Sequence, residues 1–413
     1  MQINWLKKNK HDSNELKFFF FLGVSHFIVL FLGLMSNVIW TRWMPIEVFG
    51  NYRLIFSILS IVGTFCLIGI GQGVLMSASG SADGNFSKFV RQKLNANVLG
   101  MLSLFCISVY YYISQPDSQM IAFGLLAAGL IFPFYNTSEL WLSWLNGKSK
   151  FFELATAKSV SAVLSFLTLL FIAYIQPNPL WLIVLAMLIL PAIYNLFMIR
   201  FAMSIRQNNK NDKELMTFSK HASLAFIFTG LLPLDIVLLE HFYSAKEVAI
   251  YAIALVLPEK IKGLVSIIGQ LISPKLFANK NLQFLWNSLK YKFLFLLAIF
   301  SFLGIVGFIL IPKIVILLFS IDYAYSGELG SWLWLTLCST GPISLLGTTL
   351  LATKKPIYLY TPSVIYPCSL LALFFLFIDY GVSGMIYIRC FGALILALYY
   401  LSFFFFELKK DAG

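Results

Sequence analysis

The segment SIRQNNKNDKELMTFSK, residues 204–220, is the longest polar stretch of the chain and lies near its middle. On both sides of it the sequence consists of apolar runs of about twenty residues, the length that a helix needs to cross roughly 30 Å of hydrocarbon. The whole chain of 413 residues is 59% hydrophobic and 12% charged, and its mean hydropathy is +0.84. Because a water-soluble domain carries about a quarter charged residues, this sequence predicts a membrane protein.

Twelve apolar runs surround this segment. They are expected to be helices, because every backbone polar group in lipid must be satisfied internally. The runs are apolar on all faces, unlike the alternating strands of a transmembrane barrel. The expected spans are 17–41, 50–77, 94–114, 119–146, 152–176, 179–203, 219–242, 247–274, 291–319, 328–352, 356–378 and 383–406.

The basic residues orient these spans. The chain has 30 Lys and Arg residues, and 22 of them lie in the segments that alternate as one side of a twelve-span protein. Three, namely Arg42, Arg53 and Lys246, lie on the other side, and five lie within spans. Because basic residues near span ends stay in the cytoplasm, we expect both termini to be cytoplasmic.

We therefore predict an all-α polytopic membrane protein with about twelve transmembrane helices in two six-helix lobes. An even number of spans per half gives both halves the same orientation, so a repeat would be parallel. The expected domains are an N-terminal lobe over 1–203, a cytoplasmic linker over 204–218 and a C-terminal lobe over 219–413. The apolar stretch from Phe18 to Trp40 is too long for a cleavable signal peptide and predicts a retained first span.

The sequence argues against several kinds of chemistry. The five cysteines form no CxxC pair and the four histidines are scattered, so neither a disulfide framework nor a metal site is expected. The absence of a GxxxxGK[ST] phosphate loop argues against ATP hydrolysis. The net charge of +12 is dispersed over many short loops, which indicates topology and anionic lipid, not nucleic acid. The GxGxG at 69–73 lies within a span and indicates close helix packing or a bend.

The informative residues are the ionisable ones within spans. Each costs roughly 2.5–3.5 kcal/mol at mid-bilayer and should face an interior or a water-filled cavity. Asp235 lies well inside its span, two residues after Pro233, and Glu259 follows Pro258 in the next span. Proline breaks beside buried charge indicate a hydrated, moving part of the protein. Arg389 has no acidic neighbour within a helical turn, so it must pair with another helix or with a ligand.

The sign of the deep charges indicates the cargo. The deep basic residues outnumber the deep acids Glu139, Asp235 and Glu259. This excess favours an anionic cargo, with phosphate or pyrophosphate as the natural partner. Structural alternatives remain open: Arg53 can snorkel to the interface, and two charges three residues apart in 259–262 can neutralise one another. The deep basic residues are Lys158, Lys260, Lys262 and Arg389.

Short motifs carry a resemblance to a known family. The stretches LDIVLL (234–239) and SAKEVAIYAIA (244–254) resemble the "LD–short loop–EVGIYS" pattern of polysaccharide exporters. Further echoes are VFGNY (48–52), DYAYS (322–326) and YGVSG (380–384). The chain thus resembles the O-antigen flippase (Wzx-like) family of the superfamily that also holds MATE multidrug exporters and lipid II flippases. The usual Gly before the Tyr of the eighth span is replaced by Ala249-Ile250.

The resemblance implies a central cavity between two lobes and a lipid-linked oligosaccharide substrate. A flippase of this family would move undecaprenyl-pyrophosphate-linked repeat units across the bacterial inner membrane by alternating access. No cofactor is expected beyond a coupling ion, H⁺ or Na⁺, and the expected partners are membrane lipids and other polysaccharide assembly proteins. The residues expected to engage the pyrophosphate or the sugar are Arg53, Lys158, Lys260, Lys262 and Arg389. Those expected to bind the coupling ion or to balance charge are Asp235, Glu259 and Glu139.

Three alternatives remain. A lipid II flippase of the same superfamily is the nearest, although such proteins usually have more spans. A MATE-like exporter of small cations would show an acidic excess deep in its spans. A membrane polymerase or ligase needs catalytic groups on an extended external loop, and every expected external loop here is short.

Overall fold

The computed structural model describes residues 4–114, 118–176, 179–278, 282–352 and 357–410. Over these residues the chain is built from helices and contains no strand, which confirms the predicted all-α fold. Nine helical stretches of the described chain are long and apolar enough to cross a membrane. The other three expected spans, 219–242, 247–274 and 356–378, fall on helices that are broken or that carry several charged residues.

The chain forms two compact units. Unit 1 comprises residues 1–39 and 58–230, and unit 2 comprises residues 40–57 and 231–413. The first two helices, α1 (Asn4–Trp43) and α2 (Ile46–Phe65), contribute to both units. The predicted boundaries of 1–203, 204–218 and 219–413 stay predictions.

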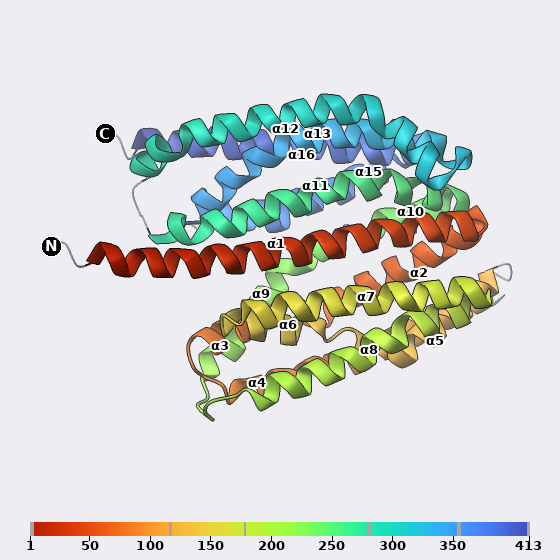
Figure 1. Cartoon of the computed structure of the whole chain (residues 1–413). Helices are drawn as coiled ribbons and strands as arrows, with labels where there is room; N and C mark the ends of the chain where they lie inside the picture. The colour runs from red at the N-terminus through yellow and green to blue at the C-terminus, as the bar shows by residue number, and fades with distance from the viewer. Residues whose placement is uncertain (1–3, 115–117, 177–178, 279–281, 353–356, 411–413) are drawn as a thin grey trace. The chain divides into compact units, whose positions relative to one another are not determined.

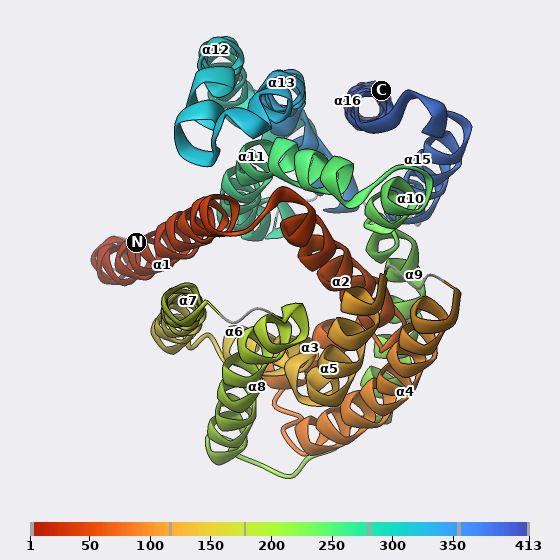
Figure 2. The same ribbon diagram turned by 90° about the vertical axis from the view of Figure 1, so that its right-hand side faces the viewer.

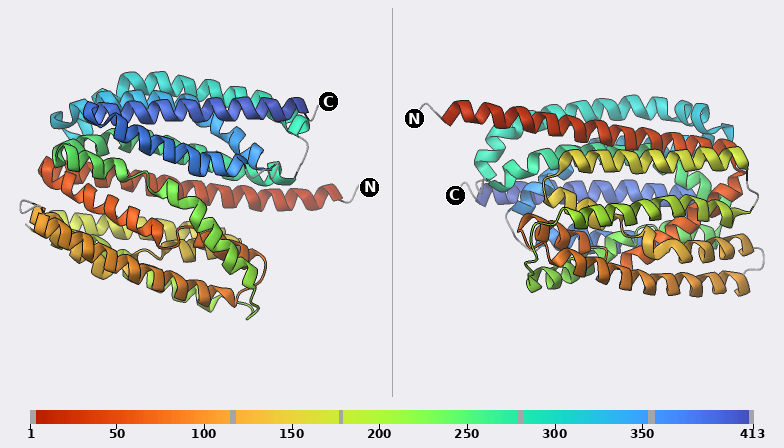
Figure 3. Two further views of the ribbon diagram at one scale, coloured as in Figure 1. Left: turned by 180° about the vertical axis from the view of Figure 1, so that it is seen from behind. Right: turned by 60° about the horizontal axis from the view of Figure 1, so that its bottom comes forward.

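Unit 1 is a helical bundle in which α4, α5 and α8 run side by side (Figure 1, Figure 2). Helix α7 packs along α8 (Figure 3), and the short helices α3 and α6 pack on each other. Its elements after α2 are α3 (Ile70–Ser79), α4 (Asn85–Ser114), α5 (Gln119–Tyr135), α6 (Ser138–Gly147), α7 (Phe151–Ile175), α8 (Leu180–Ser204) and α9 (Lys213–Gly230).

Unit 2 is built on three long helices, α12, α13 and α16, which lie side by side in Figure 1, with α11 packed on α13. Its elements are α10 (Leu234–Phe242), α11 (Ala245–Ala278), α12 (Leu282–Phe319), η2 (Ile321–Tyr323), α13 (Ala324–Ala352), α14 (Ile357–Tyr360), η3 (Thr361–Ile365), α15 (Tyr366–Leu376), η4 (Ile378–Tyr380) and α16 (Gly381–Lys410).

The outer faces of the long helices are apolar. Leu99 on α4, Phe171 on α7 and Phe302 on α12 are each more than 60% exposed. By contrast, Asp83, Lys93 and Asp235 are almost completely buried. A soluble protein would show the reverse pattern, whereas lipid favours apolar side chains outside and paired polar groups inside.

Two of the expected spans are broken near their middle, in both cases at residues of unit 1. The span 50–77 divides into α2 and α3 at residues 66–69, and the span 119–146 divides into α5 and α6 after Pro133. The last carbonyl groups of a helix have no partner within that helix. Asn97 of α4 donates to the carbonyl oxygens of Pro133 (2.9 Å) and Asn136 (3.1 Å), and Asn195 of α8 donates to that of Tyr135 (2.8 Å). Side chains thus replace the missing helical partners.

The glycines at 69–73 lie at the first of these breaks. A Cβ at Gly69 would overlap the backbone of Ala222 and Ser223, and a Cβ at Gly73 would overlap Ser219. The Gly69 amide donates to the Ser223 hydroxyl at 3.0 Å. Close packing against α9 together with a helix break confirms the predicted role of these glycines.

The segment between α8 and α9 is hydrogen-bonded to the turn that precedes α4. The Gln207 amide donates to Asp83 Oδ2 (2.7 Å), the Gly84 amide donates to the Lys210 carbonyl (2.9 Å), and the Asn85 side chain donates to the Asp212 carbonyl (2.8 Å). Lys148 forms an ion pair with the same buried Asp83 at 2.7 Å. Residues 207–212 are therefore part of unit 1's folded structure.

Candidate functional site

A buried ion pair occupies the middle of unit 2. Asp235, in the first turn of α10, is fully buried, and its Oδ2 atom accepts hydrogen bonds from Nε (3.0 Å) and Nη2 of Arg389 on α16. The Tyr251 hydroxyl of α11 donates to the same oxygen, and Arg389 Nε also lies 2.5 Å from that hydroxyl. Asp235 Oδ1 accepts from the Ile236 amide at 2.7 Å. Every oxygen of this carboxylate is therefore engaged by the protein.

The break before α10 explains how a carboxylate reaches this position. Residues 231–233 form a turn, and Pro233 precedes the first residue of α10. Asp235 thus lies at a helix N-terminus, where the helix dipole favours negative charge. The pair joins α10, α11 and α16, and an Arg–carboxylate contact in a dry interior fixes the orientation of the guanidinium.

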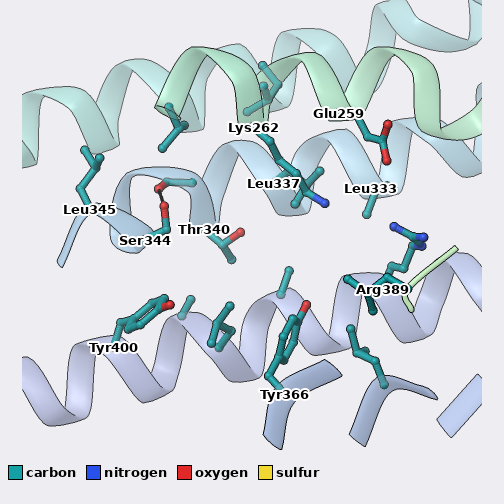
Figure 4. A pocket seen from close by; sticks show the side chains of 18 residues that line it. Glu259, Lys262, Leu333, Leu337, Thr340, Ser344, Leu345, Tyr366, Arg389 and Tyr400 are labelled. Carbon is teal, nitrogen blue, oxygen red and sulfur yellow. Dashed lines mark hydrogen bonds between the residues drawn. The ribbon is translucent and has the colours of Figure 1, made fainter. Parts of the chain in front are cut away.

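Arg389 also lines a cavity of about 500 Å³ inside unit 2. Figure 4 shows Arg389 and Glu259 facing this cavity at the same end, with Lys262 reaching in from α11. Leu345 and Tyr400 lie at the opposite end. The cavity is formed by α11, α13, α15 and α16, and aliphatic side chains supply most of its wall. Its volume falls within the roughly 300–1,000 Å³ that is typical of small-molecule sites.

The structure brings most of the predicted site residues together in unit 2. Lys262 has Arg389, Glu259 and Asp235 as its charged neighbours, and Lys260 has Glu259 and Arg53. Glu259 and Lys262 are exposed and both line the cavity. They can therefore interact with a molecule in the cavity as well as with each other. The described cluster holds four basic residues, Arg53, Lys260, Lys262 and Arg389, against the two acids Asp235 and Glu259.

Arg53 has an unusual position in this cluster. Its Nε atom is buried, and within the described part of the chain no hydrogen-bond partner lies within reach of that atom. Arg53 is a charged neighbour of Lys260, so the two basic side chains lie in the same part of unit 2.

The two remaining predicted residues, Lys158 and Glu139, lie in unit 1. Lys158 is exposed on α7. Glu139, in the first turn of α6, accepts a hydrogen bond from the Gly71 amide (3.0 Å) through Oε1, and its Oε2 lies 3.8 Å from Lys93 Nζ.

Sequence reasoning missed two residues of these sites. Lys93 lies one residue before the expected span 94–114, whereas in the structure α4 begins at Asn85 and the Lys93 side chain is 2% exposed. Its spacing of four residues from Asn97 was the available signal, because residues four apart share a helix face. Tyr251 belonged to a recognised motif, but no pattern indicated that its hydroxyl contacts Asp235.

The arrangement of helices is shared with known membrane transporters. The chain is similar to the lipid II flippase MurJ in an inward closed conformation, with a TM-score of 0.72 and 17% identity over 94% of this chain and 88% of that chain. It is similar to an inward-facing multidrug resistance MATE family transporter of the MOP superfamily, with a TM-score of 0.65 and 14% identity over 93% and 95% of the two chains. It is also similar to a MOP superfamily transporter from Pyrococcus furiosus, with a TM-score of 0.64 and 12% identity over 96% of each chain.

These likenesses define the class: the fold is that of the MOP transporters, which have twelve helices, and the predicted fold class is confirmed. Residues 16–279, more than half of the chain, match a family described as "Polysaccharide biosynthesis protein", and the chain belongs to that family. The predicted resemblance to Wzx-like polysaccharide exporters of the MOP superfamily is thereby confirmed. No curated protein sequence matches the chain.

Proposed function

We propose that this protein is a flippase for undecaprenyl-pyrophosphate-linked O-antigen or a related polysaccharide repeat unit. It would move the repeat unit from the cytoplasmic to the periplasmic leaflet of a bacterial inner membrane by alternating access, coupled to an ion. Membership of a polysaccharide biosynthesis family supports a lipid-linked saccharide as cargo. The sugar head group needs a protein to cross the membrane, because each unpaired hydroxyl costs several kcal/mol in hydrocarbon.

The proposal rests on one observation: the Arg389 side chain is held by Asp235 and lines the cavity. Asp235 and Tyr251 hold one edge of the guanidinium, while the residue lines a cavity that Lys262 also enters. A guanidinium offers five donors in a planar fork, and an oriented fork is suited to phosphate oxygens. The wider charged cluster, which adds Arg53 and Lys260 to the cavity-lining residues, has a basic excess that favours an anionic head group and argues against a MATE-like exporter of cations.

Substitution of Arg389 tests the proposal. We expect Arg389→Lys, which keeps the charge but loses the planar fork, to reduce flipping of a labelled pyrophosphate-linked oligosaccharide in proteoliposomes. Hydrogen bonds to charged groups contribute roughly 1.5–3 kcal/mol, so the loss should be on the order of 10–100-fold. Lys262→Gln should reduce flipping less, because an exposed ammonium is a weaker, more hydrated contact. Lys313→Gln on α12 replaces an exposed basic residue of the same unit outside the cavity and is the matched control.

The choice of substrate separates this proposal from its nearest alternative. Surface polysaccharide should be restored by the wild-type chain, and not by Arg389→Lys, in cells that lack their own exporter. Flipping of lipid II with no flipping of a pyrophosphate-linked repeat unit would assign the chain to lipid II transport. Full activity of Arg389→Lys at normal protein levels would remove the site.

A further inference from the structure

The break between α2 and α3 in unit 1 is occupied by a lysine. The Lys93 ammonium donates to the carbonyl oxygen of Cys66 at 2.8 Å and lies 3.5 Å from that of Leu67. These carbonyls end α2, where the helix dipole leaves partial negative charge. Leu67 has a positive φ of 58°, so the chain turns here and directs its carbonyl groups away from a regular helix.

The other side of this break is held by Glu139. Its Oε1 accepts from the Gly71 amide at the start of α3, where the dipole favours negative charge. Lys93 and Glu139 therefore hold the two helix ends with opposite charges, and their nearest charged atoms are 3.8 Å apart. That distance exceeds a hydrogen bond, so the pair is coupled electrostatically without sharing a proton.

The two residues differ in accessibility. The Lys93 side chain is 2% exposed, whereas the Glu139 side chain is 36% exposed. The carboxylate therefore keeps an open surface through which a proton could bind, and the ammonium does not. Loss of the Glu139 charge would leave Lys93 without its counter-charge but with its two carbonyl partners.

We propose that Glu139 is a proton-binding site of unit 1, and that Lys93 excludes metal cations from it. In broken transporter helices, freed carbonyl groups and half-helix ends are the groups that hold a coupling Na⁺. Here the Lys93 ammonium occupies the Cys66 and Leu67 carbonyls, so an alkali cation would find them engaged. A proton needs only a free carboxylate oxygen, and Oε2 has no closer described contact than Lys93.

The surrounding charges support this assignment. The elements packed against α6 are α3, α4, α7 and α8. Helix α3 carries no charged residue. Lys93 is the charged group that interacts with Glu139. Glu153 on α7 is paired with Lys150. The other charged groups on α4, α7 and α8 are exposed, namely Lys88, Arg91, Lys158 and Arg200.

Asp235 does not offer a comparable site in unit 2. Its oxygens are engaged by Arg389, Tyr251 and a backbone amide, and the side chain is fully buried. The guanidinium already supplies the counter-cation. Of these two carboxylates, Glu139 is therefore the one whose side chain is partly open.

Protonation would act directly on the helix break. A neutral carboxyl is a weaker acceptor than a carboxylate, so the bond between Oε1 and the Gly71 amide weakens when the proton binds. That bond ties α6 to α3, the second halves of the two broken spans. Proton binding would thus loosen one defined contact within unit 1. As an ion-coupling step, this inference rests on the proposed function.

Infrared spectroscopy of the full-length protein in lipid nanodiscs tests proton binding without any substrate. We expect the difference spectrum between pH 5 and pH 8 to contain a protonated carboxyl band that is lost in Glu139→Gln and retained in Asp235→Asn. Absence of that band from the wild-type protein, or its retention in Glu139→Gln, would overturn the proposal. Because no substrate is present, failure of the flippase proposal would leave this result unaffected.

A second arm tests the exclusion of metal ions. Replacement of choline chloride by NaCl at constant ionic strength should leave the thermal midpoint of the wild-type protein unchanged. Lys93→Met vacates the carbonyl groups, and we expect Na⁺ to stabilise that variant. A Na⁺-dependent shift in the wild-type protein that disappears in Glu139→Gln would refute the role of Lys93, even if Lys93→Met does not fold.

Discussion

The buried pair in unit 2 makes a strong prediction about stability. Asp235→Asn removes the carboxylate charge and leaves the Arg389 guanidinium, whose side chain is 15% exposed, without its counter-charge. Breaking a buried ion pair by removing one partner costs about 3–5 kcal/mol. Arg389→Gln should cost a similar amount, because it leaves a fully buried carboxylate uncompensated.

The double variant distinguishes a true pair from two independent contributions. With Asp235→Asn and Arg389→Gln combined, no buried charge is left unpaired, so the double variant should be no less stable than either single variant. For a unit of this size, about 1 kcal/mol corresponds to roughly 2–4 °C. Each single variant should therefore lower the thermal midpoint by roughly 6–20 °C.

Scanning fluorimetry in nanodiscs, without substrate, measures these midpoints. Tyr251→Phe, which removes only the hydroxyl at the same carboxylate, should have a smaller effect of about 1.5–3 kcal/mol. Glu328→Gln replaces an exposed acid on α13 and should leave the midpoint unchanged. Additive effects in the double variant would refute the reasoning, because they would show that the two charges do not stabilise each other.

Three further predictions use matched positions. Gly69→Ala should lower the free energy of unfolding by about 1–3 kcal/mol, since its Cβ meets rigid backbone, whereas Gly23→Ala meets open space and should be neutral or slightly stabilising by thermal midpoint. Lys148→Met strands the buried Asp83 and should cost about 3–5 kcal/mol, while Lys150→Met, from a half-exposed pair, should cost less than about 1 kcal/mol; equal effects would contradict the burial argument. A fluorescent protein that matures only in the cytoplasm should be fluorescent when fused after α16. A fusion that is produced but not fluorescent would contradict the predicted cytoplasmic C-terminus.

Nine of the expected spans match helices of the described chain that are long and apolar enough to cross a membrane, because hydropathy and length decide this property. The breaks within the expected spans were harder to predict from the sequence. Pro133 and Pro233 are visible in the sequence, but the break at 66–69 contains no proline. Its turn is held by two distant side chains: Lys93 lies 27 residues from the carbonyl that it binds, and Glu139 lies 68 residues from its amide donor. The glycines at 69–73 indicated close packing or a bend here, but no local pattern indicated the two side chains that hold the break.

The members of the unit 2 site could be predicted, but not their contacts. Asp235 and Arg389 each stood out as a charge inside a span, and the need of Arg389 for a distant partner followed from its apolar surroundings. That the two residues meet depends on how α10 packs against α16, over 154 positions of sequence. Asp235 was expected either to bind a coupling ion or to balance charge, and its contact with Arg389 favours the second role.

The hydrogen bonds along residues 207–212 fix the length of this segment in the middle of the chain. Asn85 and Asp212 bond reciprocally, and the Gly84 amide is matched to the Lys210 carbonyl, so adding or deleting one residue would misalign each later donor and acceptor. A reporter inserted after Asn209 should therefore disturb the start of α4. In this protein, the most hydrophilic stretch is a poor place to lengthen the chain.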